Sequence, residues 1–155
     1  MSDNQSNDRM VSVSRVISAD AATIFDILAS PEGHVAMDGS GSVQSTRTGP
    51  ERLEMGSKFG MKMKIGLPYV ISSKVVEFEE NERIAWCHLG RHRWRYELEP
   101  VADGTKVTET FDWSTAVVPK AIELMGYPDK HPASMEKTLE RLDELATSGW
   151  RPQGG

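Results

Sequence analysis

Glu109 is the residue whose type and position most clearly suggest chemistry, because it falls in an apolar row of a predicted strand. Within the strand predicted over 106–114, it alternates in step with Phe111 and Trp113. A carboxyl group on an apolar face has a raised pKa and can serve as a general acid or base. Two other interpretations stay open: a bond to Arg15 or another inward polar group, or an exposed position at the strand end.

His88, His92 and Tyr96 are further candidates for proton transfer or for orienting a ligand. Imidazole changes its charge near neutral pH, so both histidines suit either task. The alternative is that the histidines lie in water near a loop. They make a poor metal site because no third Cys, Asp or Glu ligand is evident nearby. We predict no metal and no cofactor, since the chain also lacks a glycine-rich phosphate loop and a nucleophile motif.

The hairpin that carries Glu109 can be placed from its turn. Asp103-Gly104 is a strong signal for a two-residue loop. The predicted pairs are Ala102–Thr105, Leu98–Glu109, Tyr96–Phe111 and Trp94–Trp113. Leu98 is six residues from His92, so the His92 and Glu109 sites lie roughly 20 Å apart at about 3.3 Å per residue. That separation is too long for a hydrogen-bonded dyad and weakens a catalytic interpretation.

The preceding hairpin keeps every large apolar residue on one face if its loop has three residues, Leu89-Gly90-Arg91. The pairs would be His88–His92, Trp86–Trp94 and Ile84–Tyr96. Aromatic rings and methionines on such a face line adaptable apolar ligand sites, although a core filled by side chains is the alternative. The predicted ligand-binding residues are Phe59, Met61, Met63, Trp86, His88, His92, Trp94, Tyr96, Glu109, Phe111 and Trp113.

The elements that position these residues follow from periodicity and caps. A first strand over 11–18 precedes a helix capped by Asp20 and a short helix beginning at Ser30-Pro31. Strands at meander spacing follow over 43–48, 57–65, 69–79, 83–89, 91–99 and 106–114. A short helix is predicted between Pro119 and Gly126. In the long final helix, Pro132 suits the first turn and Gly149 the end.

Length and composition indicate one domain. The 155 residues suffice for a single core, predicted over 10–150 with disordered tails at 1–9 and 151–155. No apolar run approaches the roughly 20 residues that cross a bilayer. The lone Cys87 and the lack of a signal peptide favour the cytoplasm. The net charge of −5 argues against a nucleic-acid partner, and oligomeric state is not readable.

The ordered set of local motifs resembles the START-like helix-grip (SRPBCC) superfamily, in its polyketide cyclase/dehydrase and lipid-transport branch. The resemblance runs from about Val11 to about Trp150, and its motifs are specific for the fold rather than the substrate. They cover 19–25, 73–78, 83–86, 94–100 and 104–108. It implies an α+β helix-grip fold: a curved antiparallel sheet of about six to seven strands around a long C-terminal helix, with two short helices after the first strand. In similar proteins the region equivalent to 117–127 often borders the cavity entrance. Ile122, Leu124 and Met125 could therefore line a lid; the alternative is that they only pack a short helix against the rest of the domain.

Three functions are compatible with these features. The first is a carrier or sensor that binds a lipid, quinone or polyketide-like aromatic in a cavity between the sheet and the final helix. The second is a polyketide cyclase, aromatase or dehydratase in which Glu109, Tyr96, His92 or His88 transfers protons. The third is a protein-interaction or cochaperone module, which would need an exposed apolar patch.

Overall fold

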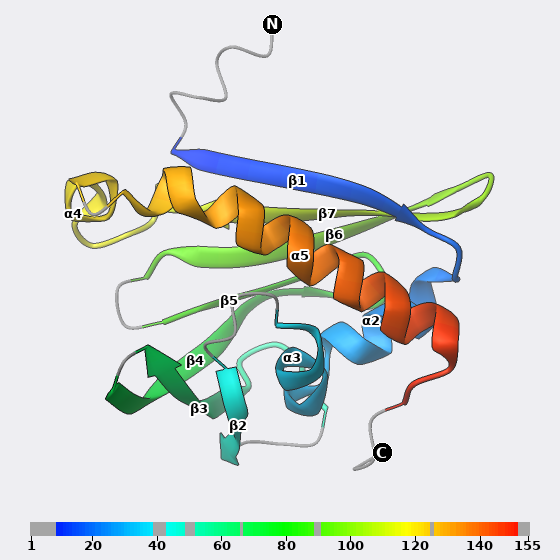
Figure 1. Ribbon diagram of the computed structural model, residues 1–155, viewed down its shortest axis with the longest axis horizontal. Helices are drawn as coiled ribbons and strands as arrows, with labels where there is room; N and C mark the ends of the chain where they lie inside the picture. The colour runs from blue at the N-terminus through cyan, green and yellow to red at the C-terminus, as the bar shows by residue number, and fades with distance from the viewer. Residues whose placement is uncertain are drawn as a thin grey trace, which may run out of the picture.

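In the described part of the chain, seven antiparallel strands form one sheet that curves around the C-terminal helix (Figure 1). The computed structural model describes residues 9–38, 43–48, 52–65, 67–88, 91–124 and 126–151. The elements are β1 (Met10–Ile17), α2 (Ala21–Leu28), α3 (Pro31–Met37), β2 (Val43–Thr48), β3 (Lys58–Ile65), β4 (Leu67–Glu79), β5 (Arg83–Cys87), β6 (Arg93–Val101), β7 (Gly104–Asp112), α4 (Pro119–Leu124) and α5 (Tyr127–Ser148). The strand order is β1-β7-β6-β5-β4-β3-β2, which confirms the predicted helix-grip fold.

Some predictions concern residues that the structure does not describe. These are most of the two predicted tails, at 1–8 and 152–155, and Leu89 and Gly90 of the predicted loop.

The two short helices after β1 begin where their caps were predicted. The Asp20 side chain accepts a hydrogen bond from the Thr23 amide at 2.9 Å, and the Ser30 hydroxyl accepts one from the Gly33 amide at 3.3 Å. Gly33 lies against the end of α2, where a Cβ atom would come within 2.1 Å of the Ile27 carbonyl oxygen. Only glycine permits this close approach, which sets α3 against the end of α2.

The hairpin of β5 and β6 has the predicted register, with Ile84 opposite Tyr96 and Trp86 opposite Trp94. The hairpin of β6 and β7 does not. Val101 pairs with Gly104, so Ala102 and Asp103 form the loop and the predicted register was wrong by two residues. The observed pairs are Leu98–Val107, Tyr96–Glu109 and Trp94–Phe111. A shift of two keeps each side chain on its predicted face, because the side-chain period of a strand is two residues.

Helix α5 crosses the inner face of the sheet and begins earlier than predicted (Figure 1). It starts at Tyr127, so Pro128 occupies its first turn, and Pro132 lies inside the helix rather than at its start. Gly149 ends the helix in a left-handed conformation with φ 86°, as predicted. Met135, Leu139 and Leu142 are buried against the rest of the core.

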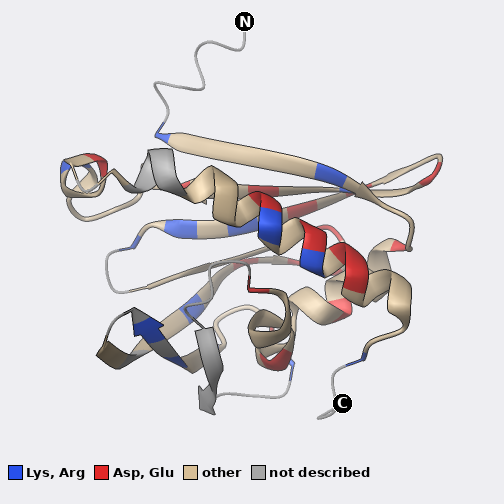
Figure 2. Ribbon diagram, in the orientation of Figure 1, with Lys and Arg blue, Asp and Glu red and all other residues tan. Residues whose placement is uncertain are grey.

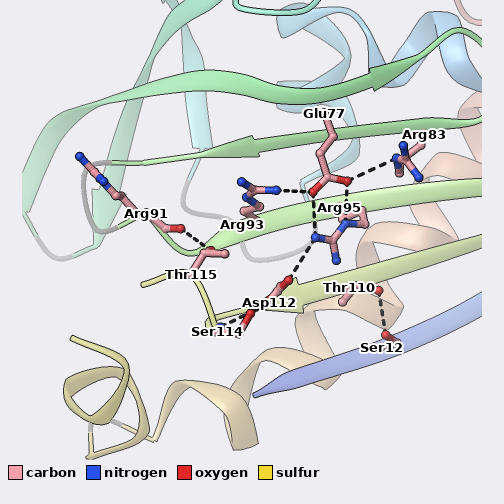
Figure 3. A network of polar contacts seen from close by, with 10 residues as sticks. All are labelled: Ser12, Glu77, Arg83, Arg91, Arg93, Arg95, Thr110, Asp112, Ser114 and Thr115. Atoms are coloured by element: carbon pink, nitrogen blue, oxygen red, sulfur yellow. Dashed lines mark hydrogen bonds and ion pairs between the residues drawn. The ribbon is translucent and has the colours of Figure 1, made fainter. Parts of the chain in front are cut away.

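The outer face of the sheet carries a network of ion pairs centred on Glu77 (Figure 3). The Glu77 carboxylate accepts hydrogen bonds from Arg93 at 2.6 Å and from Arg95 at 2.8 Å. Arg95 also donates to Asp112 at 3.1 Å. The arginines therefore lie on the outer face, where Thr110 and Asp112 are buried as well.

Candidate functional site

The inner face of the sheet gathers the predicted aromatic residues into one continuous layer. Trp86 stacks on Tyr96 at 5.5 Å between ring centroids, and Trp94 lies 4.7 Å from Phe111. Phe111 in turn stacks on Trp113 at 5.6 Å. Among the predicted ligand-binding residues, the buried ones are Phe59, Met61, Trp86, Tyr96, Glu109, Phe111 and Trp113. His88, His92 and Trp94 are half-buried, and the Met63 side chain lies outside the described residues.

Glu109 lies at the centre of this layer and is only 3% exposed. Its strand partner is Tyr96, whose hydroxyl donates a hydrogen bond to the carboxyl group. The other oxygen, Oε1, has no hydrogen-bond partner within the described part of the chain. Burial raises the pKa of Glu109 to about 8, against the lowering effect of the Tyr96 bond, and the negative charge of Asp38 adds to the rise. The carboxyl group is therefore mostly protonated at neutral pH.

The corrected register changes the surroundings expected for Glu109. Arg15 does not reach it, because Arg15 forms an ion pair with Asp143 of α5 at 2.8 Å. The separation of roughly 20 Å between the His92 and Glu109 sites was also too large. Tyr96, the partner of Glu109, is four residues from His92, or about 13 Å along the strand. The pKa of Tyr96 is raised well above its usual value, mainly by burial and next by the nearby Glu109 carboxyl, so the phenol keeps its proton.

All four histidines of the chain lie on or against the inner face. His88 shares a hydrogen bond with Ser73 at 2.7 Å between Nδ1 and Oγ, and its ring lies 5.5 Å from that of His92. Burial lowers the pKa of His88 to about 4, helped by His92 and His34, so the interpretation that it lies in water was wrong. Burial also lowers the pKa of His92, whose buried Nδ1 has no partner among the described residues.

Two of these histidines were not predicted as site residues. His34 of α3 stacks on Trp86 at 4.2 Å and donates from Nε2 to the Leu28 carbonyl at 2.8 Å. His131 of α5 lies 4.5 Å from Phe111 and 4.9 Å from Trp94. Burial lowers the pKa of each to about 4. Nothing local in the sequence marked either residue, because the packing of α3 and α5 brings both to the aromatic layer.

Asp38 was also missed. It follows α3, and its charge acts on Glu109 and Tyr96, which lie on β7 and β6. No local pattern connects these positions, since the helix packing alone brings them together.

The site is therefore apolar, aromatic and largely uncharged at neutral pH. Protonated Glu109 can donate a hydrogen bond, and neutral His92 can donate or accept one. Within the described residues, no three His, Cys, Asp or Glu side chains are placed to hold a metal ion. In the described part of the chain, hollows of about 320 and 560 Å³ lie on the outer face, around Glu97 and around Arg95. Among the described helices, none is both long and apolar enough to cross a membrane.

Comparison with known proteins agrees with this arrangement. A family model described as polyketide cyclase/dehydrase and lipid transport matches residues 9–147. The uncharacterized protein Rv0088 of Mycobacterium tuberculosis is 41% identical over 145 residues, or 90% of this chain. The chain spans 65% of the length of that relative.

Solved structures share the fold at low sequence identity. Protein NE0264 from Nitrosomonas europaea superposes with a TM-score of 0.73 at 17% identity, covering 92% of this chain and 96% of its own. The AHSA1-like protein from Aeromonas hydrophila gives a TM-score of 0.66 at 16% identity, with 90% and 94% covered.

Proposed function

Because the chain belongs to the polyketide cyclase/dehydrase and lipid-transport family, within the START-like helix-grip superfamily, we propose that it binds a small uncharged hydrophobic molecule. The ligand would lie between the inner face of the sheet and α5. A lipid, a quinone or a polyketide-like aromatic has the required character, since each combines an apolar body with a few oxygen atoms. The protein would act as a carrier or sensor of this molecule.

The observation that carries this proposal is the unsatisfied oxygen of Glu109. A buried polar atom without a partner costs stability, and such atoms are rare in native proteins. Oε1 of Glu109 and Nδ1 of His92 are two such atoms on one aromatic face. A ligand that carries carbonyl or hydroxyl oxygens at two separate positions would complete both groups without bringing a charge into an apolar site.

The test is a titration of tryptophan fluorescence with lipids, quinones and polycyclic aromatics. Trp86, Trp94 and Trp113 lie on the inner face, whereas Trp150 follows α5 and packs at the edge of the main core. We expect saturable quenching that persists in the matched control Trp150→Phe. Glu109→Gln keeps the shape and one donor, so its affinity should fall only modestly. A flat response across the whole panel would contradict ligand binding.

A cyclase, aromatase or dehydratase is the second candidate, and the Glu109–Tyr96 pair favours it. A carboxyl group with a pKa near 8 is suited to proton transfer at neutral pH. The substrate would be a polyketide-like molecule with an acidic proton or a leaving hydroxyl. Glu109→Gln and Tyr96→Phe should then abolish turnover while ligand quenching remains. Unchanged turnover in both variants, and in His88→Gln and His92→Gln, would exclude this candidate.

A further inference from the structure

Several exposed apolar side chains gather at one end of the long axis of the molecule. Val117 and Val118, directly before α4, are 66% and 57% exposed, and Leu124 at the end of α4 is 87% exposed. Leu67, at the start of β4, is 80% exposed. Figure 1 places both α4 and the start of β4 toward the left end of the molecule, with α4 beside the start of α5 and β4 at the opposite edge of that end. We name this the α4 end.

The α4 end is also basic, although the chain as a whole carries a net charge of −5. Exposed Lys62 and Lys64 lie on β3 near the hairpin, exposed Arg91 precedes β6, and exposed Lys120 lies on α4. Glu123 of α4 is neutralised by an ion pair with Arg9 at 2.9 Å. Figure 2 shows blue segments at this end, whereas the acidic β6–β7 turn and the acidic second half of α5 point the other way.

The α4 end is joined directly to the aromatic site. The Trp113 indole donates from Nε1 to Glu123 at 2.7 Å. Ile122 packs against the cluster of Phe111, Trp113 and Met135. These contacts place α4 directly against the inner aromatic layer.

We propose that the α4 end docks on the surface of an anionic lipid bilayer. Exposed apolar side chains flanked by lysine and arginine match such a surface, because the apolar groups enter the headgroup region while the cations pair with anionic lipids. A symmetric contact between two copies would place one basic end against another, so charge favours the anionic bilayer over such a dimer. Docking would bring the aromatic site close to a lipid surface, a role that rests on the proposed binding of a hydrophobic ligand.

The experiment is co-sedimentation of the full chain with vesicles of phosphatidylcholine, with and without phosphatidylglycerol. We expect binding to the anionic vesicles only, and weaker binding as salt rises. Leu124→Ser combined with Val118→Ser should remove most of the binding. Each lysine lost from Lys62 and Lys64 should weaken it roughly five-fold. Because all of these side chains are exposed, circular dichroism should show an unchanged fold.

The matched control is Val16→Ser combined with Val101→Ser. These valines are 51% and 37% exposed, but they lie at the ends of β1 and β6 that adjoin the opposite end of the molecule. The control should bind vesicles like the wild type. Equal losses in both double variants would overturn the proposal, as would a wild-type chain that ignores anionic vesicles at low salt. Self-association that depends on Leu124, measured by analytical ultracentrifugation without vesicle binding, would overturn it in favour of a second copy.

Ligand binding is measured separately by tryptophan quenching in detergent-free buffer without vesicles. Quenching without vesicle binding would overturn the docking and leave the proposed function standing. Vesicle binding without quenching by any ligand would contradict the proposed function and leave the docking proposal standing.

Discussion

Glu77 and Glu109 are two carboxyl groups in the same sheet, one on each face, and their protonation differs. Hydrogen bonds from Arg95 and then Arg93 lower the pKa of Glu77, although its partial burial opposes them. Burial raises the pKa of Glu109 to about 8, and among the described residues no cation lowers it again. Glu77 is half-buried, whereas Glu109 is buried. Because both residues are glutamates, the difference comes from their surroundings: arginine partners keep Glu77 charged, whereas burial keeps Glu109 protonated.

The largest expected effect is loss of packing on the inner face. Phe111→Ala removes a ring that contacts Trp94, Trp113 and two histidines, so unfolding free energy should fall by about 4 kcal/mol. Its neighbour Thr110 belongs to the outer face and shares a 2.8 Å hydrogen bond with Ser12. Thr110→Ala should cost about 1 kcal/mol. Chemical denaturation measures both, and equal losses would contradict the division between the faces.

The second prediction concerns the pH dependence that Glu109 confers. Its pKa in the folded chain, about 8, lies above its usual value of 4.5, so folding favours the protonated form. The stability it confers is complete below pH 4.5 and is lost as pH rises through 8. By pH 8 the loss should reach about 3 kcal/mol, somewhat less than the full shift because water can enter around the ionised group. Glu109→Gln, which cannot ionise, should be more stable than the wild type at pH 8 and similar at pH 4.

The denaturation midpoints of the wild type and of Glu109→Gln, measured from pH 4 to pH 8, would check the second prediction. If the two midpoints changed in parallel with pH, Glu109 would titrate normally in the folded protein.

The third prediction concerns acid. The pKa of His34 is lowered to about 4 from 6.5, so its neutral form contributes stability that is lost as pH falls from 6.5 through 4. His34→Gln keeps a donor for the Leu28 carbonyl but cannot gain this proton. As pH falls over that range, the free energy of unfolding of the variant should therefore decrease by about 2 kcal/mol less than that of the wild type. Thermal unfolding at pH 7 and pH 4 tests this, and identical losses would show that acid acts elsewhere.

The smallest effect is expected on the outer face. Glu77→Gln leaves Arg93 and Arg95 without their shared carboxylate and should cost about 1 kcal/mol, since partly exposed ion pairs are screened by solvent. Because the pKa of Glu77 is lowered, its contribution is present at neutral pH and lost in acid. The cost should shrink in high salt, whereas the Glu109 effect should not. A salt-independent cost would indicate lost packing instead.

The sequence by itself determined the elements, the caps and the two faces of the sheet. Asp20, Ser30 and Gly149 were identified as helix boundaries because capping depends on residues within one turn. The pairing of Trp86 with Trp94 followed from keeping large apolar residues on one face. The inward position of Glu109 survived even a wrong register, because a slip of two residues preserves the face.

Only the tertiary structure decided the β6–β7 register and the gathering of the histidines. Gly104 was assigned to the loop, but it has φ 146°, and a Cβ there would come within 2.1 Å of the Ile17 carbonyl oxygen. The glycine therefore serves the approach of β1, a contact distant in sequence. His34 and His131 reach the aromatic layer from α3 and α5, which lie far apart in the chain. Local patterns report which face a residue occupies, whereas the packing of distant elements determines its partners and thus the pKa of Glu109.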